Sequence, residues 1–190
     1  MNASLLRHRF RILLISSIAA LAPMGVSGDE SQLTARLSLS SEMDPTTMYL
    51  YMSRDFNRRS ELVESIIDYA KGYLGKPYRR GSKGPTSFDC SGFTSFVFKN
   101  FDIPLSSSSS SQYHQGTGID ITEVQPGDLL FFGGRRGSSS VGHVGMAVSV
   151  DDNGTVTFIH AATSGGIRYD QYPDGGYYSA RYIGSRRVIE

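Results

Sequence analysis

The sequence of 190 residues contains one cysteine, no tryptophan and almost no net charge. A single cysteine cannot form a disulfide within the chain, so Cys90 serves packing, chemistry or neither. The formal net charge is +1, and removing the three arginines of the first eleven residues leaves 16 basic against 18 acidic residues. Because nucleic-acid-binding domains usually carry a basic excess, we expect no nucleic-acid partner.

The sequence also lacks a hydrophobic run that is long enough to cross a membrane. The run 12–22 is interrupted by two serines, and it is about half of the roughly 20 apolar residues that a spanning helix needs. Basic residues precede it and small residues follow it up to Gly28, which is the layout of a secretory signal peptide. An uncleaved anchor is the alternative. We expect residues 1–28 to be removed, leaving an exported protein in the periplasm or outside the cell, without a stable membrane anchor.

The rest of the chain is long enough for one hydrophobic core. Residues 29–59 show no hydrophobic period and are interpreted as a leader or linker, with helix expected only around residues 48–52. From residue 60 to Leu74, apolar residues recur at i, i+3, i+4 and i+7 spacing, which predicts a helix with Ser60 as its N-cap. One folded domain is therefore expected over residues 60–190.

A second helix is predicted over residues 90–100, because apolar residues recur at helical spacing after Cys90 and Pro104 follows. The serine run 106–111 has low complexity and predicts a flexible loop. Short strands are predicted over residues 129–132, 142–150, 155–161 and 181–189. Helices followed by strands predict an α+β domain with an antiparallel sheet.

Two histidines, His143 and His160, fall in adjacent predicted strands. An Asp-Asp-Asn-Gly sequence between the strands predicts a hairpin with a four-residue loop, which would pair Val150 with Thr155. That register sets His160 opposite Gly145, on the same face as His143. Diagonal neighbours on one face lie roughly 7–8 Å apart, so the two imidazoles can hydrogen-bond.

Cys90 is predicted to be a nucleophile rather than a small buried side chain. Its polar neighbours Asp89 and Ser91 argue against an apolar core position. A helix N-terminus and a nearby imidazolium both stabilise a thiolate, so we expect a Cys90–His143 ion pair if Asp89 points away. Small residues two and four positions after His143 leave room on that face for the end of the cysteine helix, and His160 would orient His143.

Metal binding by the cysteine and the two histidines is the alternative to catalysis. Structural zinc usually has four ligands, and the sequence suggests no fourth. We therefore expect neither a metal nor another cofactor.

Five short motifs follow one another along the chain: Gly75-Lys76-Pro77-Tyr78, Phe88-Asp89-Cys90-Ser91-Gly92-Phe93, Gln125-Pro126-Gly127-Asp128-Leu129, Gly142-His143-Val144-Gly145 and Phe158-Ile159-His160-Ala161. In this combination and order, the sequence resembles the NlpC/P60 family of cell-wall cysteine peptidases over residues 62–189. The resemblance implies a papain-like α+β fold, with the nucleophile at a helix N-terminus packed on an antiparallel sheet. Residues 60–190 would be the catalytic domain.

The resemblance implies a peptidoglycan hydrolase that cleaves stem-peptide amides, most often between γ-D-glutamate and the following diamino acid, through a thioester. Cys90 would be the nucleophile, His143 the general base and acid, and His160 the orienting residue. Oxyanion stabilisation and substrate binding would fall to Tyr78, Asp89, Ser91 and one serine near Ser109. A helix N-cap is the alternative role for Asp89.

Two rival functions stay open. The same three residues can serve an amidase or acyltransferase that acts on another substrate. A catalytically silent cell-wall-binding protein is the other rival, against which the intact Cys90, His143 and His160 count. We expect a monomer that acts on peptidoglycan stem peptides. We also expect a regulatory protein partner, because an unrestrained wall hydrolase endangers its own cell.

Overall fold

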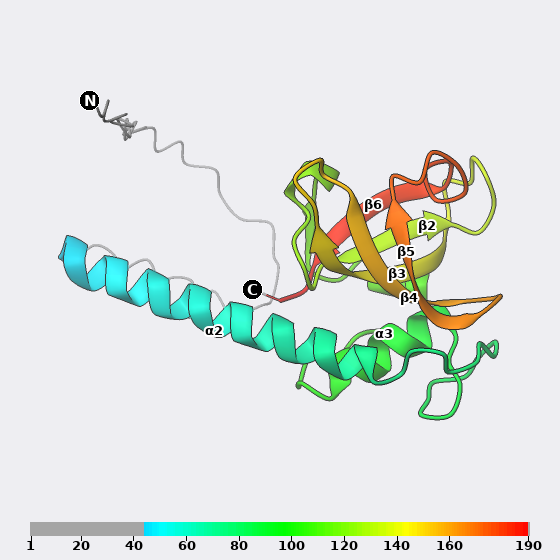
Figure 1. Cartoon of the computed structure of the whole chain (residues 1–190), viewed down its shortest axis with the longest axis horizontal. Helices are drawn as coiled ribbons and strands as arrows, with labels where there is room; N and C mark the ends of the chain where they lie inside the picture. Colours follow the sequence, from blue (N-terminus) through cyan, green and yellow to red (C-terminus); the bar gives the residue numbers. More distant parts are fainter. Residues whose placement is uncertain (1–43, 190) are drawn as a thin grey trace, which may run out of the picture. The chain divides into compact units, whose positions relative to one another are not determined.

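A six-stranded antiparallel sheet with helices against one side organises the chain (Figure 1). The structure is a computed structural model that describes residues 44–189. Its contacts divide the chain after Pro45, and Thr46–Glu190 form one unit. The predicted signal peptide and residues 29–43 of the predicted leader lie outside the described residues.

The sheet confirms the predicted α+β class and its antiparallel strands. In the order β1-β6-β2-β3-β4-β5, the strands are β1 (Thr117–Ile119), β6 (Tyr182–Arg187), β2 (Leu129–Gly133), β3 (Val141–Val150), β4 (Val156–Ala162) and β5 (Gly166–Tyr172). The sequence did not predict β1 or β5. Only the first two residues of β5 are buried, so its residues show no hydrophobic alternation.

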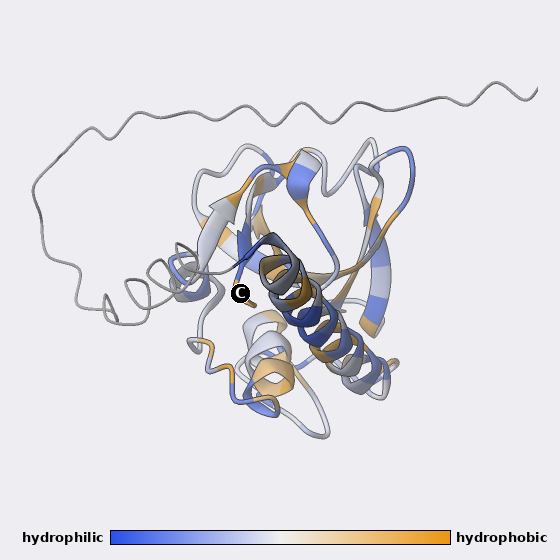
Figure 2. Ribbon diagram, turned by 90° about the vertical axis from the view of Figure 1, so that its left-hand side faces the viewer, coloured by the Kyte–Doolittle hydropathy of each residue, from blue (hydrophilic) through white to orange (hydrophobic). Residues whose placement is uncertain are grey.

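The first described helix begins well before the predicted start. The helices are α2 (Pro45–Lys71), α3 (Cys90–Lys99), α4 (Ser109–Gln112) and the 3₁₀ turn η1 (Ile121–Glu123). Ser60 lies inside α2 and is not its N-cap, so that prediction is wrong. The buried residues of α2 begin at Val63, which is why the preceding turns show no hydrophobic period. Figure 2, in which α2 points toward the viewer, shows hydrophilic and hydrophobic residues interleaved along its ribbon.

Hydrophobic residues pack on both faces of the sheet. One cluster joins the buried faces of α2 and α3 to alternate residues of β2, β3 and β4: Val63, Ile66, Ile67, Ala70, Phe93, Val97, Phe98, Leu129, Phe131, Val144, Met146, Ile159 and Ala161. A second cluster on the other face contains Leu130, Phe132, Ala147, Phe158 and Tyr178. This alternation follows from the two-residue period of a strand.

The β3–β4 hairpin differs from the predicted one at its turn. Val150 pairs with Val156, not with Thr155. The Asp151 carboxylate accepts hydrogen bonds from the backbone N–H groups of Asn153 at 2.9 Å and Thr155 at 2.7 Å. These bonds draw Thr155 into the loop, which adds one residue to it.

A bulge restores the predicted register farther along the hairpin. The pairing shifts between Ala147 and Ser149, after which Met146 pairs with Ile159. This pairing sets His160 opposite Gly145, as predicted.

The cysteine helix packs on the opposite face from the one that the sequence suggested. The buried side chains of α3 contact the cluster that contains Val144 and Met146. The space above Gly145 is filled by its neighbours, since a Cβ there would lie 2.6 Å from the Phe158 ring and 3.1 Å from the His160 Cβ. The space left by Gly145 is therefore occupied by the Phe158 ring and His160, not by the cysteine helix.

Candidate active site

Cys90 is the first residue of α3, and the residue before it caps the helix. The carboxylate of Asp89 accepts hydrogen bonds from the backbone N–H groups of Gly92 at 2.6 Å and Gly81 at 2.9 Å. These bonds hold the basic loop that precedes the helix against its N-terminus. The N-cap role given as the alternative for Asp89 is confirmed.

Cys90 lines a cleft of about 440 Å³. Tyr78 lies in one wall, and the other walls come from the ends of β2 and β4, the start of β3, and the segment before β6. His143, in β3, also lines the cleft. The structure thus brings the predicted nucleophile, the predicted base and the predicted oxyanion residue to one place.

The other three residues predicted to bind substrate do not line this cleft. The Ser91 hydroxyl donates to the Ser107 carbonyl at 3.0 Å. Ser109 is buried in α4, and Asp89 is engaged as the helix cap. Within the serine run, the Ser107 carbonyl accepts the hydrogen bond from Ser91 at the start of α3.

The serine run is tied to α3 by Gln112 and does not form the flexible loop that its composition predicted. The Gln112 side chain is fully buried. Its Nε2 donates to the carbonyls of Ser91 at 3.1 Å and Ser106 at 2.7 Å, and its Oε1 accepts from the Thr94 hydroxyl at 2.9 Å. Because these contacts are tertiary, serine composition alone does not reveal them.

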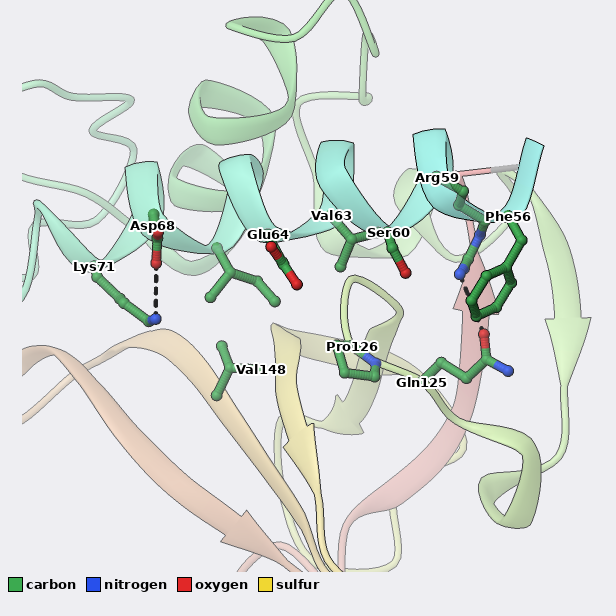
Figure 3. A pocket seen from close by; sticks show the side chains of 11 residues that line it. Phe56, Arg59, Ser60, Val63, Glu64, Asp68, Lys71, Gln125, Pro126 and Val148 are labelled. Atoms are coloured by element: carbon green, nitrogen blue, oxygen red, sulfur yellow. Dashed lines mark hydrogen bonds and ion pairs between the residues drawn. The ribbon is translucent and has the colours of Figure 1, made fainter. Parts of the chain in front are cut away.

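A larger cavity of about 560 Å³ lies between α2 and the sheet (Figure 3). Val63 and Glu64 from the helix face Pro126 and Val148 across it. Neither cysteine nor histidine lines this cavity. It is therefore not the candidate for covalent chemistry, although it is the larger of the two.

The two histidines and a carboxylate form a hydrogen-bonded series beside the cleft. His143 Nε2 lies 2.8 Å from His160 Nδ1, and His160 Nε2 lies 2.8 Å from Asp170 Oδ2. His160 is fully buried behind His143. The geometry leaves His143 Nδ1 as the ring nitrogen available to a group in the cleft.

Asp170 is held by two more donors, neither of which the sequence analysis identified. The Arg168 guanidinium donates to its Oδ2 through Nε at 3.0 Å and Nη2 at 2.7 Å. The Tyr178 hydroxyl donates to the same oxygen at 2.9 Å. The sequence could have indicated Asp170 only if β5 had been predicted. The pairing of His160 with Arg168 places Asp170 diagonally beside His160.

The thiol and the first histidine favour their neutral forms. Burial raises the pKa of Cys90, and the Asp89 carboxylate raises it further, against the opposing effect of backbone N–H groups of Ser91 and Val144. Burial and the neighbouring His160 lower the pKa of His143 to about 3. Both shifts favour a resting thiol and neutral imidazole over the ion pair expected from the sequence.

Behind His143, the second histidine is also neutral and the carboxylate is ionised. Burial lowers the pKa of His160, although its hydrogen bond to Asp170 acts against this. Burial alone would raise the pKa of Asp170, but hydrogen bonds from Arg168, His160 and Tyr178 outweigh it and lower that pKa. A neutral imidazole therefore lies between another neutral imidazole and an ionised carboxylate.

Two further features of the described residues bear on the kind of site. Across residues 44–189, no helix is long and apolar enough to cross a membrane. Within the same residues, no three His, Cys, Asp or Glu side chains are placed together to hold a metal ion.

A cysteine at a helix N-terminus that shares a cleft with a histidine of an antiparallel sheet is the arrangement of a papain-like α+β domain. The chain belongs to the NlpC/P60 family, whose model matches residues 75–187.

Several proteins with similar sequences or structures are named as peptidases, hydrolases or members of this family. The probable endopeptidase p60 of Listeria grayi is 43% identical over 98 residues, which cover 50% of this chain and 19% of that protein. The gamma-DL-glutamyl hydrolase of Bacillus subtilis is 35% identical over 126 residues, 66% of this chain and 30% of that protein. A crystal structure of an NlpC/P60 family protein from Bacillus cereus matches with a TM-score of 0.60 and 31% identity, over 67% of this chain and 40% of that one. The chain spans about a fifth of the length of the first p60 relatives that it matches.

Proposed function

We propose that the protein is a peptidoglycan endopeptidase that cleaves stem-peptide amides between γ-D-glutamate and the following diamino acid. The observation that carries this proposal is the placement of Cys90 and His143 in one cleft, with His160 hydrogen-bonded to the far nitrogen of His143. The family match supports a wall peptidase, and the name of the Bacillus subtilis relative supports the glutamyl bond.

The direction of each hydrogen bond in the series follows from the ionised carboxylate. Asp170 can only accept, so His160 Nε2 carries the proton and its Nδ1 accepts. His143 then donates through Nε2, and its Nδ1 presents a lone pair. This tautomer is the one that can take the proton of the Cys90 thiol.

Catalysis then proceeds by nucleophilic attack with His143 as the proton carrier. The Cys90 proton passes to His143 Nδ1 as the sulfur bonds to the amide carbonyl carbon. When the carbon–nitrogen bond breaks, His143 gives that proton to the leaving amine. Water, deprotonated by His143, then cleaves the thioester and restores the thiol. His160 and Asp170 orient His143 and stabilise its transient positive charge.

We propose that two hydrogen-bond donors near the N-terminus of α3 stabilise the oxyanion. One is the backbone N–H of Cys90, which points out of the first turn of the helix. The other is the hydroxyl of Tyr78, which lines the cleft beside the sulfur, and whose pKa burial and the neighbouring Cys90 raise. A raised phenol pKa keeps this hydroxyl protonated, as a hydrogen-bond donor must be.

The free amine of a cut stem is assigned to the Asp89 carboxylate at the start of α3. Asp89 supplies the carboxylate, and Ser91 and the Ser107 carbonyl lie beside it. Ser109, proposed for the same role, is the buried first residue of α4 and would act indirectly, by supporting the position of Ser107.

Digestion of purified sacculi by the protein, purified after export, tests the reaction. Mass spectrometry should find new fragments that end in γ-D-glutamate, and the Cys90→Ala variant should produce none. Turnover by that variant would end the covalent mechanism. Unchanged muropeptides with activity on another acyl substrate would favour the amidase or acyltransferase, and binding to sacculi without any cleavage would favour the silent wall-binding protein.

We propose export through cleavage of residues 1–28, with the mature protein acting as a monomer under a regulatory partner. The support is the layout of the first 28 residues. N-terminal sequencing of the protein recovered from the envelope or medium should begin near Asp29. A start at Met1 in a membrane fraction would instead indicate the uncleaved anchor.

A further inference from the structure

The charged side chains that line the Cys90 cleft are cationic. Arg168 and Arg181 line it, and no carboxylate is among its described lining residues. The charge of Arg168 is matched by Asp170. No ion pair formed by residues 44–189 includes Arg181. The cleft therefore contains one uncompensated positive charge.

Arg181 is held in place without being neutralised. Its guanidinium lies 3.7 Å from the centre of the Tyr177 ring, and its Nη1 donates to the Tyr177 carbonyl at 3.0 Å. Its Nε is buried and has no hydrogen-bond partner. A fixed guanidinium that lines the cleft without an anionic partner is suited to a carboxylate, because its remaining N–H groups can donate charge-assisted hydrogen bonds to the carboxylate oxygens.

The sheet places Arg181 on the His143 side of the cleft. Phe132 pairs with His143 in β3 and with Tyr182 in β6, and the backbone N–H of Gly133 donates to the Arg181 carbonyl at 2.7 Å. Strand β2 lies between them, so the backbones of His143 and Arg181 are two strand spacings of roughly 4.8 Å, or about 10 Å, apart. The long Arg181 side chain and a group of the substrate can together span this distance.

The proposed reaction decides which part of the substrate meets Arg181. His143 protonates the leaving amine, so the residue that supplies this amine lies beside His143. Asp89 and Ser91, assigned to the other end of the stem, are not in this cleft.

We propose that Arg181 binds a free carboxylate on the residue that supplies the leaving amine, an inference that rests on the proposed function. Two carboxylates could occupy the subsite. One is the side-chain carboxylate of a diamino acid such as diaminopimelate, which lysine lacks. The other is the main-chain carboxylate of a stem that ends at the diamino acid.

Four synthetic stems separate these sources in kinetic assays. Three are L-Ala-γ-D-Glu-X-D-Ala tetrapeptides, with X as diaminopimelate, its side-chain amide or lysine. The fourth is the tripeptide that ends at lysine. Side-chain recognition predicts a kcat/KM for the diaminopimelate tetrapeptide that is roughly tenfold or more above the other two tetrapeptides. Main-chain recognition predicts the same excess for the lysine tripeptide over the lysine tetrapeptide.

Arg186, in β6, offers a matched control. It too is stacked on a tyrosine, 4.5 Å from the Tyr113 ring centre, and its Nε is also buried without a partner. It lines a different cavity, which contains Asp120. Arg181→Gln should bring the kcat/KM ratio between carboxylate-bearing and other stems close to one, Arg181→Lys should keep part of it, and Arg186→Gln should keep all of it.

The outcomes distinguish the subsite from the reaction. Cleavage of all four stems at similar kcat/KM, or a ratio that survives Arg181→Gln, overturns the subsite and leaves the proposed function standing. Cleavage of no stem by the unmodified protein overturns the proposed function and the subsite with it. If circular dichroism shows that Arg181→Gln is unfolded, the unmodified protein and Arg181→Lys still decide the question.

Discussion

At the scale of single residues, Asp170 determines which ring nitrogen of His143 faces the cleft. It is a positioning residue, because it acts through His160 and lines no part of the cleft. Its Oδ2 accepts from His160, Arg168 and Tyr178, so the carboxylate is ionised and cannot turn without losing all three bonds.

Asp170→Asn should lower kcat about 10- to 100-fold with little change in KM. An amide can donate as well as accept, so the variant no longer fixes the proton on His160 Nε2. Nitrogen-15 NMR of the histidine rings should show mixed tautomers in the variant and one tautomer in the unmodified protein. Asp151→Asn, the same change in the β3–β4 loop, should alter neither kcat nor the spectrum. A single unchanged tautomer with full kcat in Asp170→Asn would refute the positioning role.

The resting charge state of the thiol makes a second prediction at this scale. Because burial raises the pKa of Cys90 and lowers that of His143, the free protein contains little thiolate at neutral pH. The rate of alkylation by iodoacetamide should rise with pH and show no plateau below about pH 9. His143→Ala should keep this shape. A plateau from about pH 5 to 8 that His143→Ala removes would show a preformed ion pair.

At the scale of elements, the start of α3 is fitted closely to the loop before it. A Cβ at Gly92 would lie 2.2 Å from the Ser82 carbonyl oxygen and 2.8 Å from Asp89 Oδ1. Both are held by other bonds: the Ser82 carbonyl accepts from the Asp89 N–H at 2.8 Å, and the carboxylate caps the helix. The backbone therefore has no easy way to make room.

Gly92→Ala should destabilise the protein by about 1–3 kcal/mol or more, as overpacking does, and should displace the loop that carries Tyr78. Urea unfolding measures the first effect, and a fall in kcat beyond the loss of folded protein measures the second. Gly176→Ala is the control, since its added Cβ meets only the Asp174 carbonyl oxygen at 3.9 Å. Equal stability of the two variants would contradict the close fit.

The elements also show which parts of the fold a single sequence can predict. Helix α3 and strands β2, β3 and β4 bury one or both faces, so their hydrophobic spacing reveals them and places Cys90, His143 and His160. The first half of α2 and most of β5 are exposed and show no such period. Asp170 lies in β5, which the sequence did not predict, and Arg181 is the first residue of the predicted strand 181–189, to which the sequence assigned no function. They were missed because tertiary contacts, not local spacing, give them a role.

At the scale of the whole molecule, two neutral histidines, His160 fully buried and His143 half-buried, link folding to pH. The pKa values of His143 and His160 are lowered from 6.5 in the folded protein and return to ordinary values on unfolding. The unfolded chain therefore binds more protons as the pH falls below about 6.5. This contribution to stability is complete above that pH and is lost as the pH falls toward the folded-state values. Depressed aspartate pKa values act only at lower pH, since their ordinary value is 3.8.

The free energy of unfolding should therefore fall between pH 7 and pH 5, with a slope of up to about 1.4 kcal/mol per pH unit for each of the two histidines. Urea unfolding at several pH values measures this slope. His143→Gln should roughly halve it, because one of the two groups no longer titrates. His114→Gln, which changes an exposed histidine, should leave it as it is. A flat stability profile over this range would mean that the two imidazoles are not held neutral in the folded protein. The tautomer series that orients His143 toward Cys90 would then be wrong as well.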